Sequence, residues 1–161
     1  MSAPVPERLD FAGGKRSAAF PLLTDEQIEL FARYGRERAF EAGEILLHPG
    51  DPTTGFIVVL AGRIAVVDDH GRPDERVIAE HGPRSFLGEY NAISGQPTLF
   101  TAIARAPGRA VIVPLADLRM LIATQATLSN LILGALLNRR GLLISEQVGA
   151  RIVGSRYSPD T

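Results

Sequence analysis

Residues 85–102 read Ser-Phe-Leu-Gly-Glu-Tyr-Asn-Ala-Ile-Ser-Gly-Gln-Pro-Thr-Leu-Phe-Thr-Ala (SFLGEYNAISGQPTLFTA) and have the features of an anion-binding loop. Gly88 and Glu89 end an apolar strand, a single helical turn follows, and Gly95-Gln96-Pro97 leads into a new strand. Main-chain amides at the start of a helical turn favour an anion. The stretch contains no arginine or lysine, however, so the kind of ligand it binds is the first question that the sequence raises.

The composition of the chain excludes several classes of partner and chemistry. The chain has 161 residues, of which 45% are hydrophobic and 22% charged, as expected for one globular domain with its own core. The formal net charge of −1 argues against nucleic acid as a partner, because such binding needs a basic surplus on one face. Cysteine is absent, which excludes disulfides, thiolate metal sites and redox dithiols within the chain. No apolar run reaches the length of a membrane span, and we therefore expect a cytoplasmic protein without membrane contact.

The chain divides into three zones. Residues 1–19 are rich in proline, glycine and charge, and predict a flexible leader. Thr24-Asp25-Glu26-Gln27 has the form of a capping box, and the apolar residues after it recur at helical spacing. We therefore expect a helix from near Asp25 to Tyr34 or Gly35.

Between Ala39 and Pro114 the apolar period becomes that of strands, with turn signals such as Ala61-Gly62 and Pro107-Gly108 between the runs. Many short strands at even spacing predict a β-sandwich, barrel or roll of about eight strands. The runs are FEAGEILLH, GFIVVLA, GRIAVVDD, DERVIAE, SFLGE, LFTAIARA and GRAVIVP.

Two helices are predicted after Pro114, over residues 115–124 and 127–147. The second is apolar nearly all round, whereas a helix that packs on one sheet needs only a stripe about 100° wide. It is either buried deeply in its own domain or shared between two subunits, and the second interpretation is preferred. We expect a homodimer that packs helix to helix. The residues expected in that contact are Leu131, Leu136 and Leu137.

Catalytic chemistry finds no support in the sequence. His48, His70 and His81 are isolated, without cysteine or an i,i+4 His-Glu pair, so no metal site is expected. No serine stands in a nucleophile-elbow context and no carboxylate pair is placed for acid–base work. The chain is therefore not expected to be an enzyme.

Four landmarks in order identify a family. They are Glu41-Ala42-Gly43-Glu44-Ile45 followed by Gly50-Asp51, an aliphatic strand into Ala61-Gly62-Arg63, and Phe86-Leu87-Gly88-Glu89, before two helices. This order resembles the cyclic-nucleotide-binding domain over about residues 20–145. The resemblance implies a mainly β fold: an eight-stranded antiparallel, jelly-roll-like β-roll with one N-terminal and two C-terminal helices.

In that family, the stretch quoted first corresponds to the phosphate-binding cassette. The resemblance implies that amides of its short helix face a cyclic phosphate and that Glu89 accepts a hydrogen bond from the ribose 2′-hydroxyl. The family's phosphate-gripping arginine should fall nine or ten residues after the glutamate, where this chain has Thr98 and Leu99. The cassette positions matched in this way are Gly88, Glu89, Tyr90, Asn91, Thr98, Leu99, Phe100 and Thr101.

This departure predicts that cyclic AMP binding is weak or lost, because a charge-assisted hydrogen bond contributes about 1.5–3 kcal/mol. Any ligand is then a less anionic small molecule, or one whose counter-charge comes from elsewhere, for which Arg139 or Arg140 on the last helix is suggested. The alternative is a vestigial pocket, filled by the protein's own side chains.

A narrower resemblance is to the domain of this type that precedes thioredoxin-reductase-like flavoproteins in some bacteria. Phe86–Glu89, Ser94–Gln96 and Thr101-Ala102 carry it. In such proteins FAD, NADPH and a Cys-x-x-Cys belong to the flavoprotein part, so no cofactor is expected in this chain. Residues 151–161 look like the start of a following segment, with Val153–Arg156 as a short strand that turns into a loop.

The domain boundaries that follow are a leader over 1–19, the cyclic-nucleotide-binding-type domain over 20–148, and a linker or truncated following domain over 149–161. We expect a non-catalytic regulatory domain, the sensor of a disulfide-reductase-like enzyme. One alternative is the effector domain of a Crp/Fnr-type transcription regulator without its DNA-binding part. Another is a purely structural dimerisation module.

Overall fold

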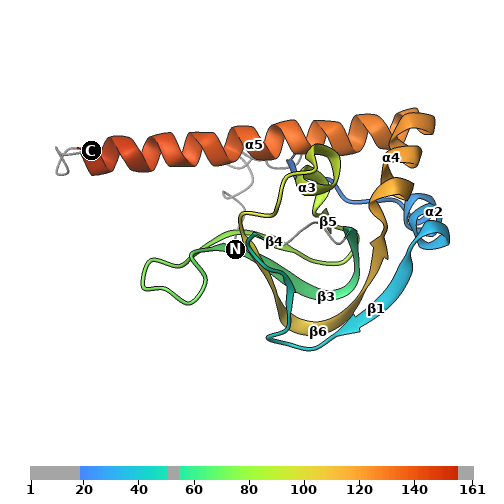
Figure 1. Cartoon of the computed structure of the whole chain (residues 1–161), viewed down its shortest axis with the longest axis horizontal. Coiled ribbons are helices and arrows are strands. Elements are labelled where there is room, and N and C mark those ends of the chain that lie inside the picture. The colour runs from blue at the N-terminus through green and yellow to red at the C-terminus, as the bar shows by residue number, and fades with distance from the viewer. Residues whose placement is uncertain (1–18, 51–54, 156–161) are drawn as a thin grey trace, which may run out of the picture. The chain divides into compact units, whose positions relative to one another are not determined.

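The computed structural model describes residues 19–50 and 55–155, with the side chains of residues 141–155 excepted (Figure 1). The predicted leader therefore lies almost wholly outside the described residues, as does the end of the tail. The described chain forms two compact units. The larger unit is Leu22–Asn130, and the smaller one combines Leu131–Ser155 with the few residues before Leu22.

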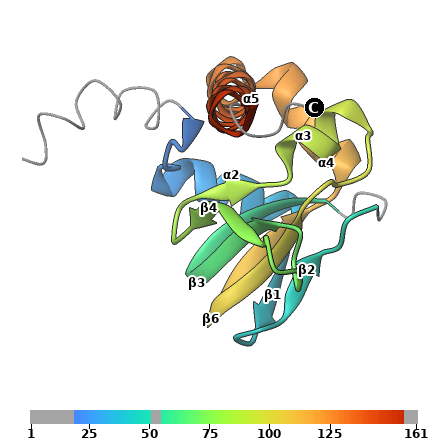
Figure 2. The same cartoon turned by 90° about the vertical axis from the view of Figure 1, so that its left-hand side faces the viewer.

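The larger unit is built on one antiparallel sheet. Its strand order is β1-β6-β3-β4, with β2 paired to β6 and β5 paired to β3, and Figure 2 shows β1, β6 and β3 side by side. The strands are β1 (Arg36–Phe40), β2 (Ile45–Leu47), β3 (Phe56–Asp68), β4 (Arg76–His81), β5 (Phe86–Leu87) and β6 (Thr101–Val113). The helices are α2 (Asp25–Tyr34), α3 (Glu89–Ser94), α4 (Leu115–Thr124) and α5 (Ala126–Ser155). The predicted mainly β architecture with flanking helices is confirmed, and in the described part of the chain α2 precedes the sheet while α4 and α5 follow it.

The strand count differs from the prediction, because six strands are described in place of eight. The predicted turns at Ala61-Gly62 and Pro107-Gly108 lie instead inside the long strands β3 and β6, where the register shifts but pairing continues. The two backbones approach closely there: a Cβ added to Gly108 would lie 1.9 Å from the carbonyl oxygen of Ala61. Glycine and proline at these places bend two paired strands together.

One core cluster of the larger unit consists of side chains of the sheet alone, and a second group of buried side chains lies between the sheet and α2. Thr24 caps α2 with the predicted capping box, in which its hydroxyl accepts from the Gln27 amide. The helix then places Phe31 against Phe56 of β3, with ring centroids 5.1 Å apart. Phe56 in turn meets Phe86 of β5 at 5.3 Å, and all three rings are fully buried. This aromatic row connects α2 to β5, the strand that leads into α3.

Helix α5 is longer than predicted. The prediction of a strand at Val153–Arg156 is wrong for residues 153–155, because the backbone is helical to Ser155. Arg156 lies outside the described residues. Extending a formed helix adds one hydrogen bond for each residue fixed, so an apolar tail without proline continues it readily. Leu128, Ile132 and Ala135 form its buried stripe, while Leu137 is 69% exposed.

Within the described part of the chain, no helix taken singly is long and apolar enough to cross a membrane. Among the residues described, one bent pair, α4 together with the first half of α5, meets the length and composition criteria.

Candidate functional site

The site begins where β5 passes into α3. Ile57 of β3 pairs with Leu87, which fixes the end of β5 against the sheet. The next residue, Gly88, is the N-cap of α3 and has a left-handed conformation, with φ of 91°. A Cβ at this position would lie 3.0 Å from the carbonyl oxygen of Gly55, so only glycine lets the two backbones approach so closely. The glycine thus sets the direction of α3.

A set of short-range hydrogen bonds closes the loop after α3. The Gly95 amide caps the helix by donating to the carbonyl oxygen of Asn91 at 2.9 Å. The Asn91 side-chain amide donates to the carbonyl oxygen of Gln96 at 3.1 Å, and the Gln96 amide donates to the Ser94 hydroxyl at 3.1 Å. Asn91 is 9% exposed, so this bond lies at the buried side of the loop. The loop therefore holds its shape through its own polar groups.

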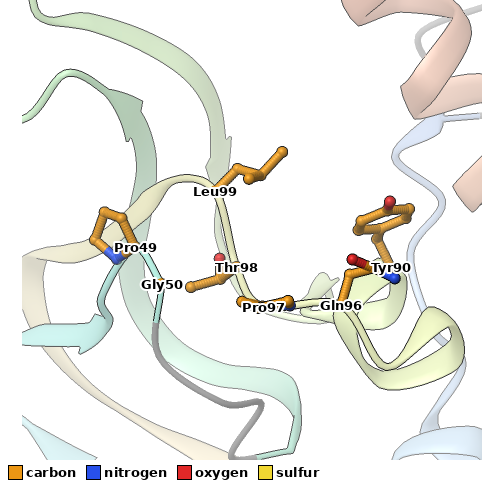
Figure 3. Close-up of a pocket in the computed structure, with 7 residues that line it drawn as sticks. All are labelled: Pro49, Gly50, Tyr90, Gln96, Pro97, Thr98 and Leu99. Atoms are coloured by element: carbon orange, nitrogen blue, oxygen red, sulfur yellow. The ribbon is translucent and has the colours of Figure 1, made fainter.

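A pocket of about 380 Å³ lies beside this loop (Figure 3). The Gly50 amide donates to the Thr98 carbonyl oxygen at 2.7 Å and so joins the turn after β2 to the far end of the cassette. In Figure 3 the side chains of Leu99 and Tyr90 stand on opposite sides of the opening, with Pro97 and Gln96 between them. The lining residues are Pro49, Gly50, Tyr90, Gln96, Pro97, Thr98 and Leu99. None of these seven carries a charge, and proline, leucine and tyrosine supply most of the wall.

The structure brings only some of the predicted site residues to this pocket. Tyr90, Thr98 and Leu99 line it, whereas Phe100 and Thr101 do not. Gly88, Glu89 and Asn91 belong to α3 and its cap, and Glu89 is 5% exposed.

The two residues at the predicted arginine positions differ in environment. Thr98 is 7% exposed and its hydroxyl donates to the carbonyl oxygen of Phe100 at 3.2 Å. Leu99 is 68% exposed at the lip of the pocket. Of these two positions, that of Leu99 therefore places an exposed apolar side chain at the entrance of the pocket.

Four lining residues were missed from the sequence: Pro49, Gly50, Gln96 and Pro97. Each belongs to a turn signal that contains proline or glycine. Such a signal predicts a loop, but it does not show which distant residues the loop will contact. In the fold, Pro49 and Gly50 follow β2, which pairs with β6, and Gln96 and Pro97 lie in the loop between α3 and β6.

The two arginines suggested on the last helix belong to the smaller unit. The Arg139 side chain donates through Nε to the carbonyl oxygen of Ala19 at 2.6 Å. Its guanidinium also lies over the Phe20 ring, 5.1 Å from the centroid. Arg140 is exposed. Within the smaller unit, Arg139 thus links α5 to Ala19 and Phe20.

Solved structures with this fold are found among bacterial regulators. The Thermus thermophilus catabolite activator protein matches with a TM-score of 0.66 and 23% identity, over 85% of this chain and 63% of its own. A cyclic nucleotide-binding domain from Methylobacillus flagellatus matches with a TM-score of 0.60 and 23% identity, over 90% of this chain and 81% of its own. Oxidised CprK in complex with o-chlorophenolacetic acid matches with a TM-score of 0.63 and 21% identity, over 86% of this chain and 56% of its own.

These likenesses confirm the β-roll fold. The chain spans less than two thirds of the catabolite activator protein. None of the curated proteins compared matches it by sequence. The model of the family described as "Cyclic nucleotide-binding domain" matches residues 37–125, which is more than half of the chain and runs from β1 to the end of α4. The chain therefore belongs to the cyclic nucleotide-binding domain family.

Proposed function

We propose that the chain is a non-catalytic regulatory domain that senses a small molecule in the pocket beside α3. The observation that carries this proposal is the cassette geometry: a left-handed Gly88 packed on Gly55, a self-closed α3 loop, and a pocket on its flank. A ligand that contacts an ordered loop beside its pocket changes the stability of the loop's closed form. Binding in the pocket can therefore change the conformation of the loop.

The proposed ligand is a small organic molecule that is less anionic and more apolar than cyclic AMP. The seven lining residues are uncharged, and an apolar wall penalises a bare phosphate that has no partner charge. CprK, with the same fold, was solved with o-chlorophenolacetic acid, an aromatic acid that is not a nucleotide. Tyr90, Leu99 and the two prolines suit such a planar, partly apolar body.

The parent protein is proposed to be one of two kinds. The first is a thioredoxin-reductase-like flavoprotein that carries this domain as its N-terminal sensor, on the resemblance of Phe86–Glu89 and the cassette that follows. The second is a Crp/Fnr-type transcription regulator, favoured by the likeness to the catabolite activator protein and CprK over most of this chain. The residues encoded after Thr161 distinguish them: a glycine-rich dinucleotide fingerprint supports the first, and a helix-turn-helix the second.

We also propose a homodimer through α5. The support is the exposed Leu137, together with the half-buried Leu131 and Leu136 on the same helix. An exposed leucine on a long apolar helix is stabilised when a second copy covers it.

The sensing function is tested by calorimetry on the whole chain with cyclic AMP, cyclic GMP, adenosine and o-chlorophenolacetic acid. The Tyr90→Ala variant removes one side of the pocket, and Tyr34→Ala, at a half-exposed tyrosine on α2, is its matched control. Binding of at least one compound that falls tenfold or more in Tyr90→Ala, and is unchanged in Tyr34→Ala, is the expected result. Absence of heat with all four compounds, or equal losses in both variants, would contradict the proposal.

A further inference from the structure

None of the described residues that line the pocket carries a charge, but a cation lies close to the pocket rim. Helix α3 packs against α4, and Figure 2 shows the two helices as neighbours. Arg119 stands in the middle of α4 and extends toward the end of α3. A Cβ built on Gly95 would lie 4.0 Å from the Nη2 atom of Arg119. Gly95 immediately precedes Gln96, which lines the pocket.

Arg119 is also available for a ligand. Its side chain is exposed, and it forms no hydrogen bond or ion pair with another residue in the described part of the chain. Some other arginines of the larger unit are occupied, since Arg84 pairs with Asp25 and Arg38 pairs with Glu44. An arginine left unpaired beside a loop of the anion-binding type keeps all its donors for an incoming group.

Because Gly95 has no side chain, a ligand can approach the guanidinium of Arg119 beside it. Among the described residues, and beyond the glycine and its chain neighbours, that same Nη2 atom is the nearest heavy atom to the built Cβ. The space beside the glycine is therefore open, and the guanidinium is the first group that a ligand atom placed there would meet. A flexible arginine reaches several ångströms from its helix, so a small movement brings it to the pocket rim.

We infer that Arg119 is the cation of this ligand site and holds an anionic group, phosphate or carboxylate, at the rim formed by Gly95 and Gln96. This inference rests on the proposed function. It places the counter-charge on α4, outside the cassette and away from the buried Thr98. Because the guanidinium is exposed to solvent, its contribution is screened, and the expected gain is about tenfold in affinity over a neutral analogue.

A purely structural role for Arg119 makes a different prediction. The carbonyl end of a helix favours a positive charge, and Arg119 lies at that end of α3. In that case its loss lowers the stability of the fold but does not change the preference between charged and neutral ligands. The experiment therefore measures a ligand preference as well as stability.

The test compares cyclic AMP with adenosine, which has the same base and ribose but no phosphate, by calorimetry at low salt. The proteins are the wild type, Arg119→Gln, Arg119→Lys and the control Arg72→Gln. Arg72 is exposed in the loop between β3 and β4, and its side chain has no partner among the described residues. Urea unfolding of each variant accompanies the titrations.

We expect the wild type to bind cyclic AMP about tenfold more tightly than adenosine, weak as both affinities are. Arg119→Gln should reduce that preference to within two- to threefold, Arg119→Lys should retain part of it, and Arg72→Gln should leave it unchanged. Higher salt should reduce the preference in the wild type.

A wild type that binds both compounds equally, or an Arg119→Gln variant that keeps the preference, overturns the inference and leaves the sensing function standing. A change in unfolding without a change in preference assigns Arg119 the structural role and also overturns the inference. A wild type that binds neither compound, nor o-chlorophenolacetic acid, removes the inference and the proposed function together.

Discussion

The side-chain amide of Asn91 donates a hydrogen bond to the main-chain carbonyl oxygen of Gln96, over 3.1 Å, across the turn that ends α3. The bond joins the helix to the segment that lines the pocket, and Asn91 is nearly buried. The position of Gln96 and Pro97 in the pocket wall therefore depends on a side chain that does not itself line the pocket.

Replacing Asn91 by aspartate should destabilise the fold by about 1–3 kcal/mol, because a buried donor is lost and a carboxylate then faces a carbonyl oxygen. Urea unfolding measures the change. Ser94→Ala is the control, since it removes an exposed hydroxyl that accepts from the Gln96 amide, and it should cost less than about 1 kcal/mol. Equal losses in the two variants would show that Asn91 does not hold the loop.

Gly88→Ala should cost more than an ordinary left-handed glycine substitution. A left-handed backbone disfavours alanine by about 1–2 kcal/mol at either site. At Gly88 the new Cβ also meets the Gly55 carbonyl oxygen at 3.0 Å, whereas at Gly71, with φ of 83°, nothing lies within 4 Å. We expect Gly88→Ala to exceed Gly71→Ala by about 1 kcal/mol in urea unfolding. Equal effects would mean that the close approach of Gly88 to Gly55 is readily relieved.

Leu99→Arg should raise affinity for cyclic AMP by a decade or more, because it adds a cation at the exposed lip of the pocket. Leu99→Gln is the uncharged control and should leave the affinity unchanged. Thr98→Arg should instead impair folding, because Thr98 is 7% exposed and its hydroxyl is bonded to Phe100. Calorimetry and unfolding measure both effects. Sub-micromolar binding by the wild type would contradict the predicted weak affinity.

Leu137→Glu should weaken the proposed homodimer, because burying a carboxylate against an apolar partner is unfavourable. The dissociation constant of the dimer should rise by about thirtyfold or more. Leu137 is 69% exposed in the single chain, so the stability of the monomer should change little. Sedimentation at micromolar concentration is the measurement. Val77→Glu, at a half-exposed valine on β4, is the control and should not change the mass. A monomeric wild type would remove the proposal.

Local chemistry was enough to predict the helices around the sheet. The capping box at Thr24 and the apolar period after it determine where α2 begins, because a cap and its helix are neighbours in sequence. The strand period of residues 39–114 likewise predicted a β-sandwich, barrel or roll, and the family resemblance implied that its strands are antiparallel. The short helical turn after Gly88 follows from residues that adjoin one another, and the order of four landmarks carried the family resemblance.

The number of strands depended on tertiary structure. Gly62 and Gly108 look like turn residues in isolation and become bends only because β3 and β6 pair through them. Whether a glycine ends a strand or bends it depends on what lies opposite, and that partner is distant in the chain.

The sequence by itself determined the cassette: its glycine, its short helix and the lack of an arginine at Thr98 and Leu99. Only the tertiary structure decided what surrounds it. The Gly50 amide reaches the Thr98 carbonyl oxygen, and α4 carries Arg119 to Gly95, through the pairing of strands and the packing of helices. The reason is physical: backbone preferences act between adjacent residues, whereas the charge that a loop experiences comes from whichever elements pack against it.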